Sequence, residues 1–216
     1  MLDTARPDLS STQPLRLPKA AGARKIAALM FDLDRFVADC RAAHAADRSH
    51  KHVREVVARA VSDPAAVLAA LGEPKRGGVY KLHHSSDLTV LNVVWAPGMT
   101  IMPHNHQMWA VIGVYTGRED NIFWRRVAGQ PGKVEAAGAK ALGEKDAEPL
   151  GHNIIHSVTN PIPRLSGALH VYGGDFFMPE GRSEWDPESL LERPYDAAHA
   201  MRLFEQANEK LKEVRH

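Results

Sequence analysis

The sequence predicts a mainly β fold, an antiparallel barrel or sandwich between a helical N-terminal segment and a C-terminal helix. Short β-rich runs separated by glycine and proline occupy the middle of the 216-residue chain. This spacing is typical of antiparallel barrels and sandwiches. On either side of these runs, apolar residues recur at intervals of three and four, which is the spacing of one helix face. We therefore expect strands in the middle of the chain and helices toward its two ends.

The first residues of the chain show neither helical nor strand spacing. Residues 1–22 include Pro7, Pro14 and Pro18, with serine and threonine between them. They contain no apolar stretch of the kind that a signal peptide has. We predict a flexible N-terminal arm over residues 1–22.

A helical segment is predicted over residues 23–76. One set of apolar residues has helical spacing in its first part: Ile26, Met30, Leu33, Val37 and Cys40. A second set follows: Val53, Val56, Val57, Ala60 and Val61. Asp63 and Pro64 then stand in the order of an N-cap and a first helical residue, and Gly72 is a typical residue at a helix end. We expect this segment to have a structural role.

A β-barrel is predicted over residues 77–180. The candidate strands are five β-rich runs, at residues 88–95, 109–115, 121–127, 153–158 and 166–172. Turn signals such as Pro97-Gly98 and Pro131-Gly132 separate them. A C-terminal extension and helix are predicted over residues 181–216, with Met201, Phe204 and Leu211 as candidate apolar contacts.

The charge and composition of the chain exclude several classes of function. The 27 basic and 26 acidic residues give a net charge of +1, so the chain has no long-range attraction for nucleic acid or an anionic membrane. No apolar run approaches the roughly 20 residues that span a bilayer. The single cysteine, Cys40, has no partner for an internal disulfide, which favours a reducing compartment. We expect a cytoplasmic protein whose partners are small molecules.

Two histidines form the most informative motif. His104 and His106 are two residues apart and follow a β-rich run and a Pro97-Gly98 turn. Residues i and i+2 of a strand point to the same face, so the two imidazoles can converge. Convergent imidazoles are the beginning of a transition-metal site. His156, in a later β-rich run, is the candidate for a third nitrogen ligand.

The surroundings of these histidines resemble the two signature motifs of the cupin superfamily. The first motif has Gly98 before His104 and His106 and Gly117 after them, and the second reads Gly143-x5-Pro149-x-Gly151-x4-His156-x3-Asn160. The resemblance implies a double-stranded β-helix, a barrel of jelly-roll type, with His104, His106 and His156 as metal ligands. Ala110 stands where cupins usually carry a glutamate ligand, and the second motif is two residues longer than usual before its histidine. The implied ligand set is three neutral imidazoles.

A narrower resemblance accounts for the missing glutamate. The motif residues together are similar to the thiol dioxygenase family, which contains cysteine dioxygenase and 3-mercaptopropionate dioxygenase: Trp95, His104, His106, Trp109, His156, His170 and Tyr172. The resemblance implies non-haem iron(II) held by three histidines, with His170 and Tyr172 beside the open face of the iron. It also implies an enzyme that oxidises a small thiol to a sulfinate with O2.

The chemistry of three imidazoles is compatible with this function. Neutral ligands leave the metal with its full double positive charge, which attracts a thiolate. Fe(II) is the metal that the resemblance implies, and zinc, nickel and manganese are the alternatives, because imidazole also suits them. His170 and Tyr172 are two residues apart on one expected strand, so His170 can orient the hydroxyl of Tyr172.

The sequence departs from this family at the places that tune the site. Ala168 stands where the family has a serine that bonds to the histidine before the tyrosine. No arginine stands on the early strand where the family reads a substrate carboxylate. Lys81 is the candidate there, and His83 is expected on the same strand face. Further candidates for substrate contacts are Trp95 and Trp109, together with four basic residues: Arg118, Arg125, Arg126 and Arg164.

Two other functions remain open at the level of sequence. One is a metal-dependent cupin enzyme that acts on a non-thiol small molecule, which the departures favour. The other is a non-catalytic cupin that binds a metal for structure; its site would be closed by protein ligands, whereas a catalyst keeps a position open. A homodimer is an arrangement that such folds often adopt.

Overall fold

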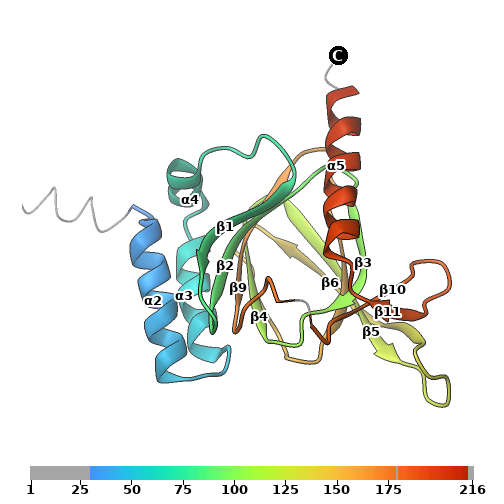
Figure 1. The fold of residues 1–216 in the computed structure, drawn as a ribbon. Helices are drawn as coiled ribbons and strands as arrows, with labels where there is room; N and C mark the ends of the chain where they lie inside the picture. Colours follow the sequence, from blue (N-terminus) through green and yellow to red (C-terminus); the bar gives the residue numbers. More distant parts are fainter. Residues whose placement is uncertain (1–29, 179, 214–216) are drawn as a thin grey trace, which may run out of the picture. The chain divides into compact units, whose positions relative to one another are not determined.

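The computed structural model describes residues 30–178 and 180–213. The predicted arm over residues 1–22, the part of the helical pattern that contains Ile26, and His216 lie outside the described residues. Within them, three helices precede a set of strands and one long helix follows it (Figure 1).

Capping residues set several ends of the three N-terminal helices. They are α2 (Leu33–Ala46), α3 (Lys51–Val61) and α4 (Pro64–Leu71). The carboxylate of Asp32 accepts a hydrogen bond from the Arg35 amide, and that of Asp63 accepts one from the Ala66 amide, so both residues act as N-caps. Gly72 ends α4 with a φ of 81°, a value that favours glycine.

The strands form two antiparallel sheets. The first contains, in spatial order, β1 (Gly78–His84), β2 (Thr89–Trp95), β9 (Ser166–Tyr172), β4 (Ala110–Thr116) and β7 (Ala147–Leu150). The second contains β11 (Glu192–Pro194), β10 (Ser183–Trp185), β3 (Thr100–Asn105), β8 (Ile155–Thr159), β5 (Arg118–Arg126) and β6 (Val134–Gly143).

The path of the chain makes these sheets a double-stranded β-helix. From β2 to β5, and again from β6 to β10, each strand lies in the sheet opposite to the strand before it. The chain therefore winds around a shared interior rather than completing one sheet before the next. This arrangement, with helices before and after it, confirms the predicted fold class.

The barrel extends beyond residue 180, which the sequence had assigned as its end. Strand β10 pairs with β3, with Glu184 opposite His104, and β11 pairs with β10. Short strands of three residues carry too little periodicity to be recognised in a sequence. Their pairing places part of the predicted C-terminal extension directly beside a candidate metal ligand.

Strand β9 shows how the two faces of the first sheet are used. Ala168 and Tyr172 belong to the core cluster inside the barrel, whereas Leu169 and Val171 pack with the helices. The helices contribute buried residues to that outer layer: Phe36, Cys40, Val53, Val56, Val57, Val61 and Val67. The helical segment therefore covers one sheet and leaves the barrel interior to the candidate site (Figure 1).

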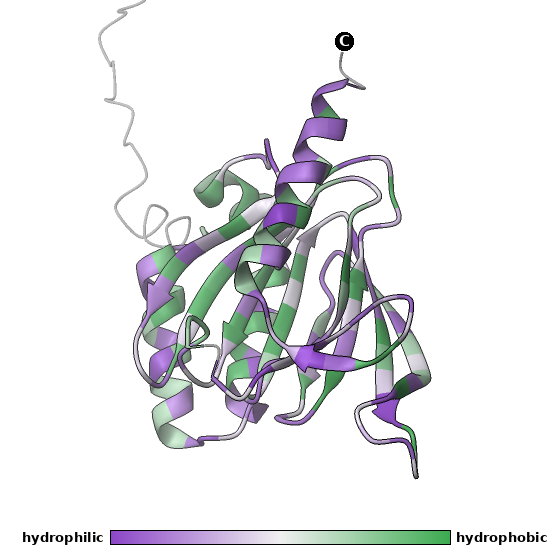
Figure 2. Cartoon of the chain, turned by 45° about the vertical axis from the view of Figure 1, so that its right-hand side comes forward, coloured by the Kyte–Doolittle hydropathy of each residue, from purple (hydrophilic) through white to green (hydrophobic). Residues whose placement is uncertain are grey.

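Helix α5 (Ala197–Glu213) packs elsewhere, close to β1, β2 and β3. The ring of Phe204 stacks on the ring of Trp95 with 5.4 Å between centroids. Farther along, the buried amide of Asn208 accepts from the Gly77 N–H and donates to the Gly77 carbonyl. The last turns of α5 are mostly hydrophilic (Figure 2). Among the described residues, no helix is long and apolar enough to cross a membrane.

Candidate metal centre

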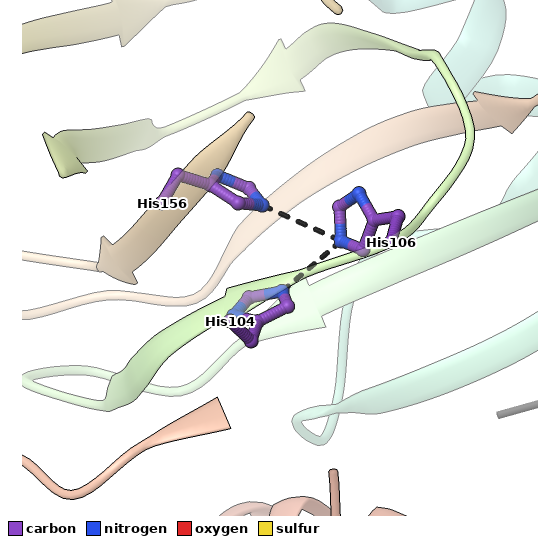
Figure 3. Close-up of side chains that lie close together, drawn as sticks. All are labelled: His104, His106 and His156. Carbon is purple, nitrogen blue, oxygen red and sulfur yellow. Dashed lines mark hydrogen bonds between the residues drawn. The ribbon is translucent and has the colours of Figure 1, made fainter. Parts of the chain in front are cut away.

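Three histidine side chains meet inside the barrel. The Nε2 atom of His106 lies 3.0 Å from Nε2 of His104 and 3.4 Å from Nε2 of His156 (Figure 3). All three side chains are buried. The sequence expectation that these histidines converge therefore agrees with the structure.

Strand pairing and a bulge bring the three rings together. His104 on β3 lies directly opposite His156 on β8, and opposite residues of an antiparallel pair share a sheet face. The register shifts between Ile101 and His104, where Pro103 lacks an amide hydrogen for the ladder. His106 follows the last residue of β3, just before Gln107 turns the chain with a φ of 55°.

Two of the histidines are held by hydrogen bonds through Nδ1. The Nδ1–H of His104 donates to the Met102 carbonyl at 3.0 Å, and Nδ1 of His156 lies 2.7 Å from the carbonyl oxygen of the Asn121 side chain. Both acceptors require the proton on Nδ1, which leaves a lone pair on Nε2. Nδ1 of His106 is buried, and no described residue forms a hydrogen bond with it.

Burial keeps all three imidazoles neutral. It lowers the pKa of His104 to about 4, partly offset by the hydrogen bond to Met102. Burial, followed by the positive charge of neighbouring histidines, lowers the pKa of His106 and of His156 well below the usual value. A neutral imidazole is the form that binds a metal ion.

The geometry fits a divalent metal. Nitrogen ligands at about 2.1 Å from an ion and at 90–109° to one another lie about 3.0–3.4 Å apart, which is the spacing of the Nε2 atoms around His106. Within the part of the chain that the structure describes, the cluster contains three histidines and no carboxylate. Three protein ligands leave positions open for other molecules.

The open side of the cluster faces a cavity of about 370 Å³. Its polar lining includes His170, Tyr172, Arg182 and Tyr195 in addition to the three histidines. The apolar part of the lining comes from both sheets and from α5: Val79, Val93, Trp95, Ile101, Val158, Phe176, Phe177, Ala197, Ala200, Met201 and Phe204.

Tyr172 and His170 form a hydrogen-bonded pair beside the cluster. Nδ1 of His170 lies 3.1 Å from the Tyr172 hydroxyl, and the Tyr172 ring contacts the His106 ring edge to face at 5.0 Å. Burial raises the pKa of Tyr172, so its phenol stays protonated. Ala168 offers no hydroxyl, and the other nitrogen of His170 lies 3.3 Å from the carboxylate of Glu119 instead.

Arg182 is the charged residue of the cavity that the sequence reasoning missed. Its guanidinium is stacked between the rings of Phe176 and Tyr195, at 4.8 and 4.3 Å from their centroids. Nη1 donates to the Phe176 carbonyl and Nε to the Asn105 carbonyl, but Nη2 is buried without a hydrogen-bond partner. Burial lowers the pKa of Arg182. No ion pair to this guanidinium exists among the described residues, so it is available to an anionic ligand.

The early-strand candidates lie outside the cavity wall. Lys81 is exposed, with Nζ 5.5 Å from the centre of the Phe177 ring. The expectation that His83 shares its strand face is wrong, because the register of β1 shifts between the two residues. His84, not His83, contacts the same Phe177 ring, while His83 lies near Arg41 of α2.

The two candidate tryptophans have different surroundings. Trp95 lines the cavity, and its indole donates a 2.9 Å hydrogen bond to Glu119. Trp109 packs with the helical layer, contacts the His44 ring at a tilt of 59° and donates to the Arg48 carbonyl. Trp109 stands one residue before β4, on the outer side of the sheet, so its position does not support the expected substrate contact.

The four other basic candidates pair with acidic residues on the surface. Arg118 binds Asp120, Arg125 binds Glu135, Arg126 binds Glu192 and Arg164 binds Glu144. Arg125 and Arg126 are both exposed, and they lie beyond Trp124, the last residue of β5 that pairs with β8. None of the four arginines lines the cavity, so their positions do not support a substrate contact there.

Two polar residues on β5, Glu119 and Asn121, were also missed. Both are buried and face the barrel interior, with Glu119 fully inaccessible to solvent. The spacing of two residues would have placed both on one strand face. This strand was expected to begin at Asn121, so Glu119 fell outside it. Arg182 gave no signal in the sequence, because it follows a loop and precedes a three-residue strand.

The likeness of this chain to known proteins is distant. No protein-family model matches the chain. A double-stranded β-helix cupin protein from Methanocaldococcus jannaschii is 12% identical over 49% of this chain and 86% of that chain, with a TM-score of 0.41. A conserved protein with a double-stranded β-helix domain from Klebsiella pneumoniae is 16% identical over 55% and 94%, with a TM-score of 0.39. DMSP lyase DddQ from Ruegeria pomeroyi is 19% identical over 52% and 53%, with a TM-score of 0.39. These likenesses cover about half of this chain and assign no reaction to it.

Proposed function

We propose that this protein is a non-haem iron(II) dioxygenase of the thiol dioxygenase type, which oxidises a small thiol to a sulfinate with O2. The observation that carries the proposal is the cluster of His104, His106 and His156 without a carboxylate ligand, open to a cavity that also contains Tyr172 and Arg182. Iron bound to the three Nε2 atoms would supply the electron chemistry and the charge that attracts a thiolate. Nickel, manganese and zinc fit the same nitrogen donors, and the reaction selects iron among them.

The residues around the cluster would handle the proton and exclude water. In the overall reaction, RSH + O2 gives RSO2⁻ and H⁺: sulfur is oxidised, and both oxygen atoms are reduced and become bonded to it. The Tyr172 oxygen can receive a proton from the substrate while its own proton passes to Nδ1 of His170 at 3.1 Å. The stacked rings of Trp95 and Phe204 close the cavity on the side of α5.

Arg182 would bind the carboxylate of the substrate. Its free Nη2 is buried in the cavity wall, where a charge-assisted hydrogen bond is stronger than in water. Lys81 is exposed and has no comparable geometry. This assignment favours carboxylate-bearing thiols over thiols that carry only an amine.

The size of the cavity favours a second candidate, a metal-dependent oxygenase that acts on a larger, non-thiol substrate. About 370 Å³ with a predominantly apolar lining holds more than a three-carbon thiol. In that case Arg182 would still bind an anionic group, and the apolar body of the molecule would lie under α5.

Oxygen uptake by the Fe(II)-loaded protein tests the proposal. The substrates are cysteine, 3-mercaptopropionate, mercaptosuccinate and cysteamine, and the sulfinate product is measured by mass spectrometry. We expect uptake matched by sulfinate with at least one carboxylate-bearing thiol and little with cysteamine.

The matched control is His156→Ala, which should lose both stoichiometric iron and oxygen uptake. Full iron retention in this variant would rule out the ligand assignment. If the wild type has a full iron site but consumes no oxygen with any thiol, the thiol proposal is wrong and the oxygenase of a larger, non-thiol substrate is favoured.

A further inference from the structure

A buried carboxylate connects the metal ligands to the tyrosine pair. Glu119 on β5 is 0% exposed, and no lysine or arginine pairs with it among the described residues. Its Oε2 lies 2.9 Å from Nε1 of Trp95 and 3.3 Å from Nε2 of His170, and its Oε1 lies 3.1 Å from Nδ2 of Asn121. A buried carboxylate with three nitrogen neighbours is an acceptor for three donors.

On one side, this carboxylate determines how Asn121 is oriented. Only the amide NH2 of Asn121 can face Oε1, since the amide oxygen would be repelled there. The Asn121 oxygen must then point at Nδ1 of His156, 2.7 Å away. His156 consequently carries its proton on Nδ1 and keeps its Nε2 lone pair directed at the histidine cluster.

On the other side, the same carboxylate determines the tautomer of His170. A proton on Nε2 donates to Oε2 of Glu119, which leaves Nδ1 as an acceptor. The Tyr172 hydroxyl then donates to Nδ1 at 3.1 Å. The oxygen lone pairs of Tyr172 are left free toward the cavity.

We propose that Glu119 is a positioning residue that fixes the proton positions of two histidines, the metal ligand His156 through Asn121 and the tyrosine partner His170 directly. Glu119 is neither one of the three clustered histidines nor a residue that lines the cavity, so it acts through the residues it contacts. The proposal concerns where two protons lie in the metal-free protein, so it does not depend on which reaction the protein catalyses.

The test is a long-range 1H–15N spectrum of metal-free protein labelled with 15N-histidine, which distinguishes the two neutral tautomers and the imidazolium. In the wild type at pH 7.5, we expect His156 with its proton on Nδ1 and His170 with its proton on Nε2. The opposite tautomer at either residue, or a doubly protonated His170, would overturn the proposal without any variant.

Glu119→Gln provides the perturbation. A glutamine that turns its NH2 toward Asn121 forces that amide to flip, which moves the His156 proton to Nε2. A glutamine that turns its NH2 toward Trp95 and His170 instead forces the His170 proton to Nδ1. One of the two histidines must therefore change tautomer, and unchanged spectra for both would contradict the proposal.

Two controls separate this effect from a general disturbance. Trp95→Phe removes one donor to Glu119 and leaves both carboxylate oxygens as acceptors for Asn121 and His170. Both histidine tautomers should therefore persist. His104 is bonded to a backbone carbonyl and should keep its Nδ1 proton in every variant. If His156 is the residue that changes, the affinity of the same sample for added Zn(II) should fall about 10- to 100-fold, and an unchanged affinity would contradict the link to the ligand.

Discussion

At the scale of single residues, the interior of this barrel is unusual because it gathers titratable groups where most folds place aliphatic side chains. Four histidines, one glutamate and one arginine are buried around one cavity: His104, His106, His156, His170, Glu119 and Arg182. Each has a hydrogen bond or a stacked ring, except at Nδ1 of His106 and Nη2 of Arg182. Unpaired buried polar atoms are costly, which makes these two atoms the natural contacts for ligands or water.

The stability of the metal-free protein should fall as the pH drops below about 6.5. Burial holds the pKa of His106 and His156 well below the unfolded value of about 6.5. Below that pH, the unfolded chain therefore binds more protons than the folded protein, which favours unfolding. The loss should approach about 1.4 kcal/mol per pH unit for each histidine. His104 adds to the loss from about pH 6.5 down to about pH 4, where it protonates in the folded protein and its contribution levels off.

Urea unfolding from pH 7.5 to 4.5 measures this effect. The comparison is with His106→Asn, since Nδ1 of His106 has no partner to lose and the carboxylates titrate equally in both proteins. The free energy of unfolding of the variant should depend less steeply on pH below 6.5. Parallel curves would show that His106 is not buried in its neutral form.

Substitution of Arg182 should change substrate binding selectively. In Arg182→Met, the KM for a carboxylate-bearing substrate should rise roughly 10- to 100-fold, as expected for the loss of a charged hydrogen bond. Arg182→Lys keeps the charge but not the planar guanidinium, so its KM should lie between those of the wild type and Arg182→Met. Steady-state kinetics on the best thiol of the panel provide the measurement. An equal loss for cysteamine would show that Arg182 supports the fold rather than the carboxylate.

At the scale of elements, short strands and bulges determine which side chains reach the cavity. The shift between Lys81 and His83 turns His84 toward Phe177, and the end of the β5–β8 pairing at Trp124 leaves Arg125 and Arg126 outside. Strand β10 carries Glu184, which accepts hydrogen bonds from Arg193 and from the Asp196 amide at the start of α5. The position of α5 over the cavity therefore depends on residues that are far from the histidine motif in the sequence but pair with it in space.

The other end of α5 should loosen when its link to β1 is removed. Asn208→Ala leaves the buried N–H and C=O of Gly77 without partners, at a cost of about 1–3 kcal/mol for each unsatisfied group. Hydrogen exchange should become faster in the C-terminal half of α5. Glu209→Ala, an exposed neighbour paired only with Lys212, is the control and should leave exchange unchanged. Equal exchange in both variants would show that other contacts hold the helix.

At the scale of the whole molecule, the helical layer and the barrel are joined by close backbone approach. A Cβ atom at Gly113 of β4 would lie 2.4 Å from Cγ1 of Val57 and 2.9 Å from Cγ1 of Val61, both on α3. Such distances require the valine side chains or the helix to shift. The glycine at this position lets α3 contact the sheet directly.

Gly113→Ala should therefore destabilise the protein by about 1–3 kcal/mol, as overpacking in a core typically does. Gly138→Ala is the control, because a Cβ at that position of β6 meets no atom within 4 Å. Urea unfolding of the two variants measures the difference. A Gly113→Ala variant as stable as the control would show that the helical layer is free to move away from the sheet.

The sequence by itself determined the features that depend on local spacing. Asp63, Pro64 and Gly72 delimit α4 because capping is a property of neighbouring residues. The spacing of His170 and Tyr172 predicted that both lie on one face of a strand, and both line the cavity. The two histidine motifs predicted the three residues that meet, since His104 and His106 are close in the chain and His156 belongs to a recognisable pattern.

Only the tertiary structure decided which distant groups complete the site. Glu119, Asn121 and Arg182 reach the histidines through strand pairing and a loop path that no local pattern encodes. A bulge in β1 changed the face of His83, because a single extra residue inverts every later side chain in a strand. The ligand atoms follow from residue type and spacing, whereas the surrounding hydrogen bonds depend on the register between strands that are far apart in the sequence.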